Sequence, residues 1–184
     1  MKELEAVTIM RTENLDRRER VLAALDGLGI GYKLVEHPAV FSAKDNDDSI
    51  AMERAAGGAV IFKNLFLRNK DKSRYYLYSL PIDKRADLPG LAKLLGEKKL
   101  GFGSAEALWD KLHITAGTVS LLNVVDAVGT EVTVLIDRDI YKSEGFGIHP
   151  NDNTATVVLL PEDIVRVLEW AGVEYRFVEL GCGG

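Results

Sequence analysis

The sequence predicts a mixed α+β fold in which helices surround a mixed β-sheet. Helical and extended hydrophobic patterns alternate along the chain without a regular βαβ period, which argues against a doubly wound parallel sheet. Several extended segments lie close enough in the sequence to pair as hairpins. The chain has 184 residues, of which 47% are hydrophobic and 28% charged, and this suits one domain with one core. We therefore expect a single domain over residues 1–184, with flexible termini at 1–14 and 181–184.

The elements in the first half of the chain follow from hydrophobic spacing and turn residues. Apolar residues at helical spacing predict a helix that begins at an N-cap, Asn14, runs to about Asp26 and is ended by glycines. The strand predicted over 32–36 turns at His37, because a residue that precedes proline avoids the helical conformation. A helix and then two strands of a hairpin are expected over 47–56, 59–69 and 74–81.

The second half of the chain alternates short helices with apolar segments. Helical spacing predicts helices over 88–95 and 104–112, and Pro161 is a favourable first-turn residue for a last helix that runs to about Ala171. Extended segments are expected where apolar residues run between turn signals, over 98–103, 119–125, 131–137, 154–160 and 174–180.

Positive charge is concentrated in one part of an otherwise acidic chain. The formal net charge is −5, yet residues 63–99 contain ten Lys or Arg and four Asp or Glu, a local balance of +6. Such a basic zone could contact a phosphate backbone, and it could equally be the solvated face of a hairpin. The candidates for phosphate contact flank one hairpin turn: Arg68, Lys70, Lys72 and Arg74.

Several classes of chemistry lack their sequence signals. The single cysteine, Cys182, cannot build a disulfide framework, which favours a reducing compartment. The first residues lack the apolar core of a signal peptide, and no stretch approaches the ~18 apolar residues of a membrane span, so we expect a cytoplasmic location without membrane contact. His37, His113 and His149 lie far apart and lack metal-ligand spacing. No nucleophile elbow, Walker loop or dinucleotide-binding pattern occurs, so we expect neither metal nor cofactor.

Three local features remain as candidates for a site. Lys63 and its neighbour Asn64 lie in a strand that is apolar on both faces, so the ammonium either extends to solvent at the strand end or enters a cleft to hold an anion or polarise a carbonyl. The segment 147–156 places His149 at the mouth of a strand, where loops often line sites, although a surface turn would look the same. The small-residue loop over 116–120 could let a ligand approach the backbone, or could simply lead into a strand.

Four segments in this order resemble the YbaK/prolyl-tRNA editing-domain family, above all its free-standing ProX/PrdX type. They are EHPAVFS (36–42), FKNLFLRNKDKSRYYLYSLP (62–81), AGTVSLLN (116–123) and IHPNDNTATVVL (148–159), and the resemblance extends over roughly residues 15–180. It implies a compact mixed α/β domain with a curved, barrel-like sheet. It also implies a metal-independent hydrolase that removes wrong amino acids, typically alanine, from tRNA(Pro).

The resemblance also implies roles for particular residues. Lys63 matches the family's essential lysine, His149 matches the histidine of the second motif, and Gly117 matches the start of a Gly-x-x-x-Pro loop. This chain has Leu121 where that loop has proline, and because the loop shapes the amino-acid pocket, the departure bears on the preference for alanine. The residues expected to bind substrate are Phe41, Ser42, Asn64, Thr118, Ser120 and Asn151.

The mechanism that the resemblance suggests is attack by water, assisted by the terminal ribose hydroxyl of the substrate. Lys63 would hold the carbonyl or phosphate side, and backbone N–H groups of the Gly117 loop would stabilise the oxyanion. The expected partner is aminoacylated tRNA(Pro), with prolyl-tRNA synthetase or an elongation factor as candidate protein partners. Two alternatives stay open: a deacylase of the same fold for Cys- or Ser-charged tRNA, and a non-catalytic tRNA-binding module.

Overall fold

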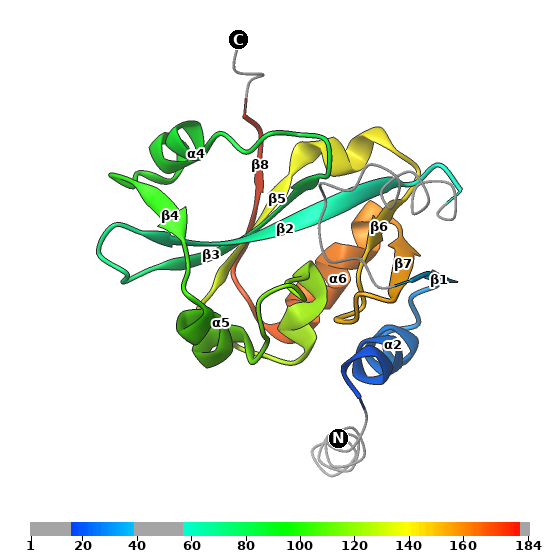
Figure 1. Cartoon of the computed structure of the whole chain (residues 1–184). Coiled ribbons are helices and arrows are strands. Elements are labelled where there is room, and N and C mark those ends of the chain that lie inside the picture. The colour runs from blue at the N-terminus through cyan, green and yellow to red at the C-terminus, as the bar shows by residue number, and fades with distance from the viewer. Residues whose placement is uncertain (1–15, 39–56, 181–184) are drawn as a thin grey trace.

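The computed structural model of the chain describes residues 16–38 and 57–180 (Figure 1). The helix predicted over 47–56, the N-cap Asn14 and the termini 1–14 and 181–184 lie outside these residues. The described residues form four α-helices and a mixed sheet of eight strands, so the predicted mixed α+β fold is confirmed.

The strand β2 (Val60–Asn69) organises the sheet because it pairs with three other strands. Along one edge it pairs antiparallel with β3 (Tyr75–Pro81), as the hairpin pattern predicts. On the other edge its start pairs in parallel with β6 (Phe146–Ile148), and its end pairs antiparallel with β4 (Leu100–Phe102). Segments that are about 85 residues apart in the chain therefore meet on one strand.

The remaining strands extend the sheet on both sides, in the order β1-β7-β6-β2-β3-β5-β8. Antiparallel pairs add β7 (Ala155–Leu159) to β6 and β1 (Lys33–Glu36) to β7. Parallel pairs add β5 (Thr133–Asp137) to β3 and β8 (Tyr175–Val178) to β5. The sheet is thus mixed throughout and does not have the all-parallel order of a doubly wound protein.

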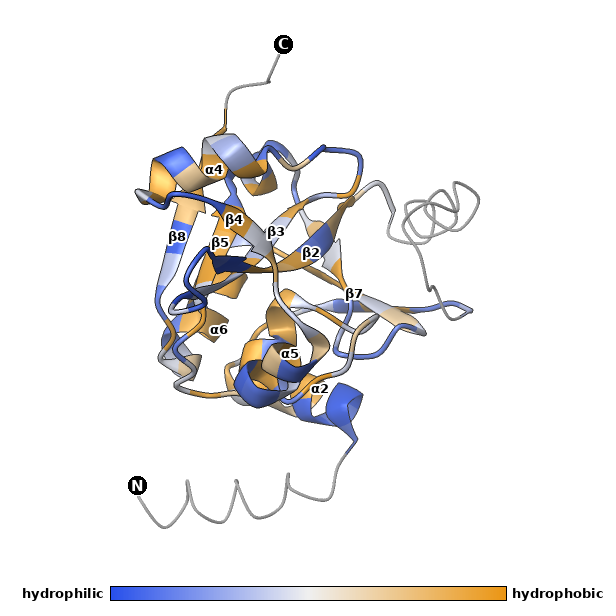
Figure 2. Cartoon of the chain, turned by 60° about the vertical axis from the view of Figure 1, so that its left-hand side comes forward, coloured by the Kyte–Doolittle hydropathy of each residue, from blue (hydrophilic) through white to orange (hydrophobic). Residues whose placement is uncertain are grey.

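Three helices cover one face of the sheet and the fourth covers the other face (Figure 1 and Figure 2). The three are α2 (Arg17–Gly27), α5 (Ala105–Leu112) and α6 (Pro161–Ala171), whose buried side chains belong to the larger hydrophobic core. The fourth helix, α4 (Leu88–Leu95), packs Leu91 into a smaller core on the opposite face. The sheet therefore separates two apolar regions, each covered by helices on its outer side.

Alternation along β2 and β3 sorts their side chains between these two cores. Phe62, Phe66 and Leu77 belong to the larger core, whereas Leu67 and Tyr78 belong to the smaller one. A strand that is apolar on both faces is buried on both faces, which is why β2 carries an almost continuous hydrophobic run.

The helix ends follow from capping residues. The N-cap of α2 is Asp16, whose carboxylate accepts a hydrogen bond from the Glu19 N–H at 2.9 Å, so this helix begins two residues later than predicted. By contrast, α6 begins at Pro161, as predicted, and ends before Gly172, which adopts the left-handed conformation of a C-cap.

The apolar segment 119–125 differs from the prediction of an extended segment. Its residues Leu121–Val125 form a 3₁₀ helix, η1, because Ser120 and Asn123 make a reciprocal capping box at its start. A second 3₁₀ helix, η2 (Arg138–Lys142), follows β5 directly. Hydrophobicity alone could not distinguish a buried 3₁₀ turn from a buried strand at this length.

Replacing Gly103 with alanine should lower the free energy of unfolding by about 1–3 kcal/mol. A Cβ at this position would overlap the ring of Phe66, which is buried and stacks on Tyr75 with ring centroids 5.5 Å apart. Denaturant unfolding of Gly103→Ala measures the loss. Gly101→Ala is the matched control, because a Cβ there meets nothing within 4 Å, and an equal loss in both variants would contradict this packing argument.

Candidate functional site

Lys63 lies on β2 with its ammonium group at the turn that follows β3. Its Nζ donates a hydrogen bond to the Ile82 carbonyl at 2.9 Å, and the side chain is partly buried. Desolvation lowers the pKa of Lys63, because burial disfavours the charged form, and the nearby Asp83 carboxylate opposes this shift. The structure therefore holds an incompletely solvated cation at a fixed place, where it can bind an anion or a carbonyl oxygen.

The edge of β2 beside Lys63 has no neighbouring strand among residues 16–38 and 57–180. On this edge β6 pairs with Val60 and Ile61, β4 pairs from Leu67 onward, and the Gly103 N–H reaches back to the Phe66 carbonyl. The strand residues between these two contacts keep extended geometry without a partner strand in the described part of the chain. Backbone groups at this opening are candidates for contact with a ligand.

A pair of histidines lies on neighbouring elements, with the ring centroids of His37 and His149 5.9 Å apart. The His37 Nδ1 lies 2.8 Å from the Pro38 carbonyl, which can only accept, so Nδ1 donates this hydrogen bond, and the His37 Nε2 lies 3.0 Å from the Thr156 hydroxyl. Burial, and secondarily the charge of His37, lowers the pKa of His149 to about 4. The His149 imidazole is therefore neutral at pH 7.

The pairing register between β2 and β6 relates Lys63 to His149. Ile61 lies opposite Gly147. Lys63 is two residues after Ile61 and His149 is two residues after Gly147, so the side chains of Lys63 and His149 are expected to share one face of the sheet. Gly147 suits this crowded face, since a Cβ there would lie 2.5 Å from the Ile61 Cδ1 and 3.0 Å from the Thr156 Cγ2. His37 belongs to this group because its ring lies beside that of His149, although the sequence analysis did not select it as a site residue. The segment EHPAVFS, which contains His37, was the sequence feature that could have indicated it.

The loop that contains Gly117 is connected to His149 by hydrogen bonds. Gly117 is exposed and has a φ of +94°, a conformation that favours glycine, and the neighbouring Thr118 hydroxyl donates to the Thr115 carbonyl at 3.1 Å. At the end of the loop, the buried Ser120 hydroxyl donates to the His149 carbonyl at 2.5 Å. The loop and the histidine segment therefore hold each other in place.

Asn151 extends this connection through a buried amide network. Its side chain accepts from the Asn123 amide at 2.8 Å and donates to the Leu122 carbonyl and to Asp126 at 3.1 Å. Because the polar atoms of Asn151 and Ser120 are used inside the protein, their described contacts support a role in fixing the loops. Direct contact of these two side chains with a ligand stays a prediction.

Asn64 and Ser79 form a buried polar pair across β2 and β3. They lie directly opposite each other in the register, on the face that carries Phe62 and Phe66, and hence on the face opposite to Lys63. The Asn64 Oδ1 and the Ser79 Oγ are the buried side-chain atoms that lack a hydrogen-bond partner within the described residues. A buried unpaired acceptor is costly, so a ligand or a water molecule that donates to it would be bound favourably. No motif in the sequence marked Ser79.

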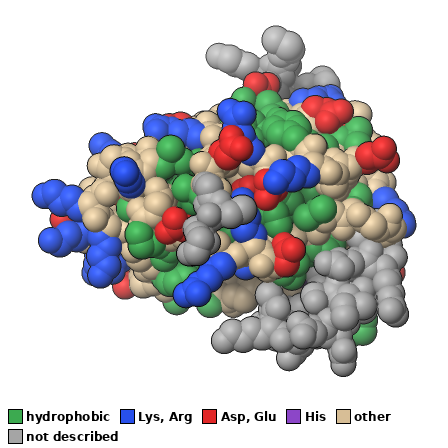
Figure 3. Space-filling view, turned by 90° about the horizontal axis from the view of Figure 1, so that it is seen from above, with side chains coloured by type: hydrophobic (Ala, Val, Ile, Leu, Met, Phe, Trp, Pro, Cys, Tyr) green, Lys and Arg blue, Asp and Glu red, His purple; other side chains and the backbone are tan. Residues whose placement is uncertain are grey.

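The basic hairpin (residues 68–74) projects from the end of β2 and β3, and Figure 3 shows Lys and Arg side chains gathered at one end of the molecule. The Asn69 side chain shapes its turn, because its Oδ1 accepts from the backbone N–H groups of Ser73 and Arg74 at 3.0 and 3.2 Å. Arg74 pairs with Glu97 at 3.3 Å. Since Asn69 pairs with Leu100 of β4, Lys98 and Lys99 are brought close to the same turn.

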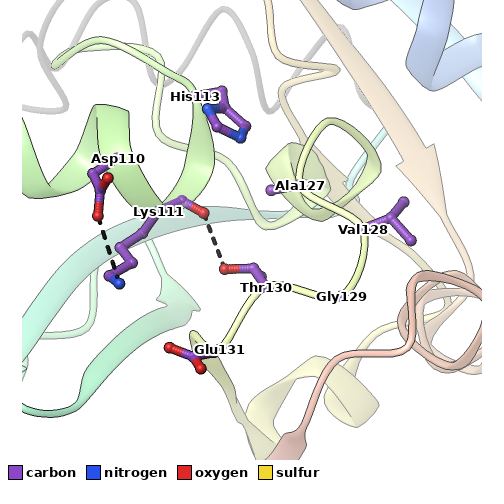
Figure 4. A pocket seen from close by; sticks show the side chains of 8 residues that line it. All are labelled: Asp110, Lys111, His113, Ala127, Val128, Gly129, Thr130 and Glu131. Atoms are coloured by element: carbon purple, nitrogen blue, oxygen red, sulfur yellow. Dashed lines mark hydrogen bonds and ion pairs between the residues drawn. The ribbon is translucent and has the colours of Figure 1, made fainter.

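A surface pocket of about 240 Å³ lies between the end of α5 and the loop before β5 (Figure 4). Its lining includes Asp110, Lys111 and His113 from one side and Thr130 and Glu131 from the other. The Thr130 hydroxyl donates to the Lys111 carbonyl at 3.0 Å, which ties the two sides together. None of the predicted site residues lines this pocket.

Residues 16–38 and 57–180 show neither a metal-binding cluster nor a membrane-spanning helix. Those residues contain no grouping of three or more His, Cys, Asp or Glu side chains that could hold a metal ion. None of the helices formed by them has the length and hydrophobicity needed to span a bilayer. Phe41 and Ser42, which were predicted to bind substrate, lie outside the described residues.

Comparison with known proteins shows similarity over most of the chain. Residues 43–167 match the family described as the aminoacyl-tRNA editing domain. The chain is 35% identical over 167 residues to the prolyl-tRNA editing protein ProX of Acetoanaerobium sticklandii, covering 91% of this chain and 99% of that protein. It is 31% identical over 157 residues to the prolyl-tRNA synthetase associated domain-containing protein 1 of Danio rerio, covering 84% of this chain and 83% of that protein.

Solved structures share the fold at lower sequence identity. One is the crystal structure of a provisionally assigned trans-editing enzyme for prolyl tRNA synthetase, with a TM-score of 0.67, 22% identity, and coverage of 91% of this chain and 99% of that one. A second is the crystal structure of hypothetical protein APE2540, with a TM-score of 0.65 and 15% identity, covering 85% of this chain and 96% of that one. At these identities the likeness supports the fold alone.

The neutral state of His149 should make the protein less stable as the pH falls from 6.5 to about 4. The ordinary pKa is 6.5 and the folded-state pKa is about 4, so in this window the unfolded chain binds a proton that the folded protein does not. The cost should reach at most about 3 kcal/mol at the lower end. Urea unfolding of His149→Gln should show a smaller loss over this window than the unchanged protein.

The control for this measurement is His113→Asn, which replaces an exposed imidazole at the left-handed C-cap of α5 with a residue that tolerates the same conformation. It should retain the pH dependence of the unchanged protein. Parallel loss of stability in the unchanged protein and in His149→Gln would show that His149 is not held neutral by the fold.

Proposed function

Because the chain belongs to the aminoacyl-tRNA editing-domain family, we propose that it hydrolyses the ester bond of mischarged tRNA(Pro), with Ala-tRNA(Pro) as the principal substrate. The observation that carries the proposal is the partly buried Lys63 ammonium, held by the Ile82 carbonyl at the turn that follows β3 and related by strand register to a neutral histidine. A relative that is named for prolyl-tRNA editing and covered over 99% of its length supports the substrate class. We further propose that residues 1–184 act as one editing domain in the cytoplasm.

The proposed reaction needs no protein nucleophile, because an aminoacyl ester is already activated. A water molecule attacks the carbonyl carbon and the bond to the ribose oxygen breaks. That oxygen takes up one proton of the water, the other proton is released to solvent, and the amino acid leaves as its carboxylate. The Lys63 ammonium stabilises the negative charge that develops on the carbonyl oxygen or holds the adjacent phosphate. Neutral His149 can exchange a hydrogen bond with the ribose hydroxyls, and backbone N–H groups of the Gly117 loop provide further donors.

The amino-acid preference is proposed from Asn64, which lies where one edge of β2 has no partner strand among the described residues, and from Leu121 at the start of η1. Asn64 has a buried oxygen without a described partner, which could accept a hydrogen bond from the substrate's α-ammonium group. Leu121 stands where the family loop has proline, and it is fully buried in the larger core at the start of η1. This departure supports a second candidate, in which the pocket accepts Cys- or Ser-charged tRNA. Prolyl-tRNA would be excluded by the size of its ring.

We propose that the basic hairpin contacts the acceptor stem of the tRNA. Lys63 and Asn69 are six residues apart on one strand, which separates the reacting end from the hairpin by about 20 Å. Arg68, Lys70, Lys72 and Arg74 can reach phosphates at that distance from the aminoacyl ester, and the solvated face of a hairpin remains the competing interpretation. Prolyl-tRNA synthetase or an elongation factor would be a protein partner through the same tRNA.

The test of the function is a deacylation panel with Ala-, Cys-, Ser- and Pro-charged tRNA(Pro). We expect the fastest hydrolysis for Ala-tRNA(Pro) and none above background for Pro-tRNA(Pro). Lys63→Ala should reduce the rate by at least about 100-fold, the scale measured for the loss of one oxyanion donor, without lowering the melting temperature. The fold should survive because a lysine within an apolar strand costs stability. A fully active Lys63→Ala protein, or one that loses fold and activity together, would count against a catalytic lysine.

The double variant Lys70→Glu with Lys72→Glu should raise the KM for full-length tRNA and leave the KM for an aminoacylated terminal adenosine nearly unchanged. Each phosphate contact removed should also reduce the slope of log affinity against log salt by about 0.7–0.9. The comparison is made over roughly 50–200 mM salt, where the loss of phosphate contacts changes the affinity measurably. Equal effects on both substrates would mean that the hairpin shapes the pocket and does not bind the acceptor stem.

A further inference from the structure

The turn that holds Lys63 is a separate structural unit at the end of β3. Ile82 accepts the Lys63 hydrogen bond through its carbonyl, and the next residue is Asp83, whose carboxylate acts on the Lys63 charge. The turn is bound to the sheet by two backbone hydrogen bonds, from Ile82 N–H to the Ile61 carbonyl at 2.9 Å and from Lys84 N–H to the Pro81 carbonyl at 3.0 Å. Any displacement of this turn would therefore move both groups that act on Lys63.

A buried ion pair fixes the far end of this turn. The Lys84 Nζ lies 2.8 Å from the Asp137 carboxylate and 3.2 Å from Asp139. Asp137 is completely buried at the end of β5, where it also accepts from the Tyr78 hydroxyl at 3.1 Å and from the Asp139 N–H at 3.0 Å. A buried carboxylate of this kind strongly favours a nearby cation, so Lys84 is held in place from the core outward.

We propose that Lys84, through its pair with Asp137, is a positioning residue for the site: it holds the turn of residues 82–84 in the place from which Ile82 and Asp83 orient the Lys63 ammonium. The catalytic consequence rests on the function proposed above, whereas the structural connection does not. Among the described residues, no hydrogen bond or ion pair joins Lys84 or Asp137 to Lys63, so the effect passes through the turn.

The physical reason for such a support is the flexibility of lysine. The lysine side chain has four rotatable bonds. Its ammonium donates one proton to the Ile82 carbonyl, which leaves two protons for substrate, and the direction of these two is fixed only while the turn stays in place. A small misplacement of a catalytic group can reduce the rate by up to about 100-fold. A support built from a rigid strand end and a buried charge keeps the acceptor carbonyl fixed before substrate arrives.

The first arm of the test measures deacylation by the full chain. Lys84→Met should lower kcat roughly 10- to 100-fold while KM changes less than about twofold, because binding surfaces are untouched and only the orientation of Lys63 is lost. Lys84→Arg keeps a cation next to Asp137 and should restore most of the rate. Lys142→Met is the matched control, since Lys142 pairs with Asp139 at 2.7 Å from the exposed side of the same acidic cluster, and it should leave kcat unchanged.

A second variant removes the effect of an uncompensated buried charge. Lys84→Met combined with Asp137→Asn leaves no unpaired carboxylate, and asparagine can still cap η2 and accept from Tyr78. This double variant should fold like the unchanged protein and still show the lowered kcat. Recovery of kcat in the double variant would overturn the proposal, because the loss in Lys84→Met would then come from the buried charge alone.

The second arm does not depend on deacylase activity. Brief labelling of lysines with acetic anhydride, followed by mass spectrometry, reports the reactivity of the Lys63 amine in the folded protein. Lys84→Met should increase Lys63 labelling severalfold, and Lys84→Arg and Lys142→Met should not. Unchanged labelling in Lys84→Met would overturn the proposal. A wild-type protein without deacylation but with this labelling pattern would retain the positioning role and refute only the proposed function.

Discussion

The pairing of β2 along both of its edges is the constraint on which the other features depend. One edge is occupied by β3 over nearly its whole length, and the other is shared between β6 at the start and β4 at the end. This sharing brings the His149 segment to one end of the strand and the Lys98–Lys99 turn to the other. It also leaves a short length of edge beside Lys63 without a strand from the described part of the chain. A substitution that shifted the β2 register by one residue would move Lys63 to the face of Asn64 and disconnect the whole arrangement.

Polar groups on the two faces of β2 differ in whether they have hydrogen-bond partners. On the face of Lys63, the ammonium has an acceptor carbonyl, the His37 ring lies within hydrogen-bond distance of Pro38 and Thr156, and burial lowers the pKa of His149. On the face of Asn64, the amide oxygen and Ser79 are buried within an apolar core without partners among the described residues. An unsatisfied pair in that position costs stability, and such costs are typically retained where the groups serve a ligand. The site thus has polar groups with hydrogen-bond partners on one face of β2, and polar groups without such partners among the described residues on the other face.

Local signals in the sequence were sufficient for elements whose ends carry caps. The helix over 88–95 follows from helical spacing, and the helix over 161–171 follows from that spacing with Pro161 at its start; both have the predicted bounds. The hairpin over 59–81 follows from two apolar runs and a polar turn.

Lys63 and His149 could be selected as candidate site residues because charged or titratable side chains are unusual inside such apolar patterns. The extended segment expected over 119–125 was wrong, because Leu121–Val125 form a 3₁₀ helix whose start is fixed by the reciprocal hydrogen bonds of Ser120 and Asn123. The importance of Ser79 and His37 could not be predicted in the same way, since it depends on which strands become neighbours.

The Asn69 side chain has a consequence for how this protein can change over time. The Asn69 amide satisfies the backbone of the turn from within. The side chains of Lys70, Asp71 and Lys72 at the tip therefore make no hydrogen bond or ion pair that the described part of the fold requires. Substitutions at the tip are therefore nearly free of a folding penalty, provided that Asn69 stays and the left-handed conformation at Lys72 is tolerated. The tip can acquire or lose charge while the reacting end stays constant. Natural variation in this family could accordingly adjust affinity for different nucleic acids at the hairpin and preserve the chemistry about 20 Å away.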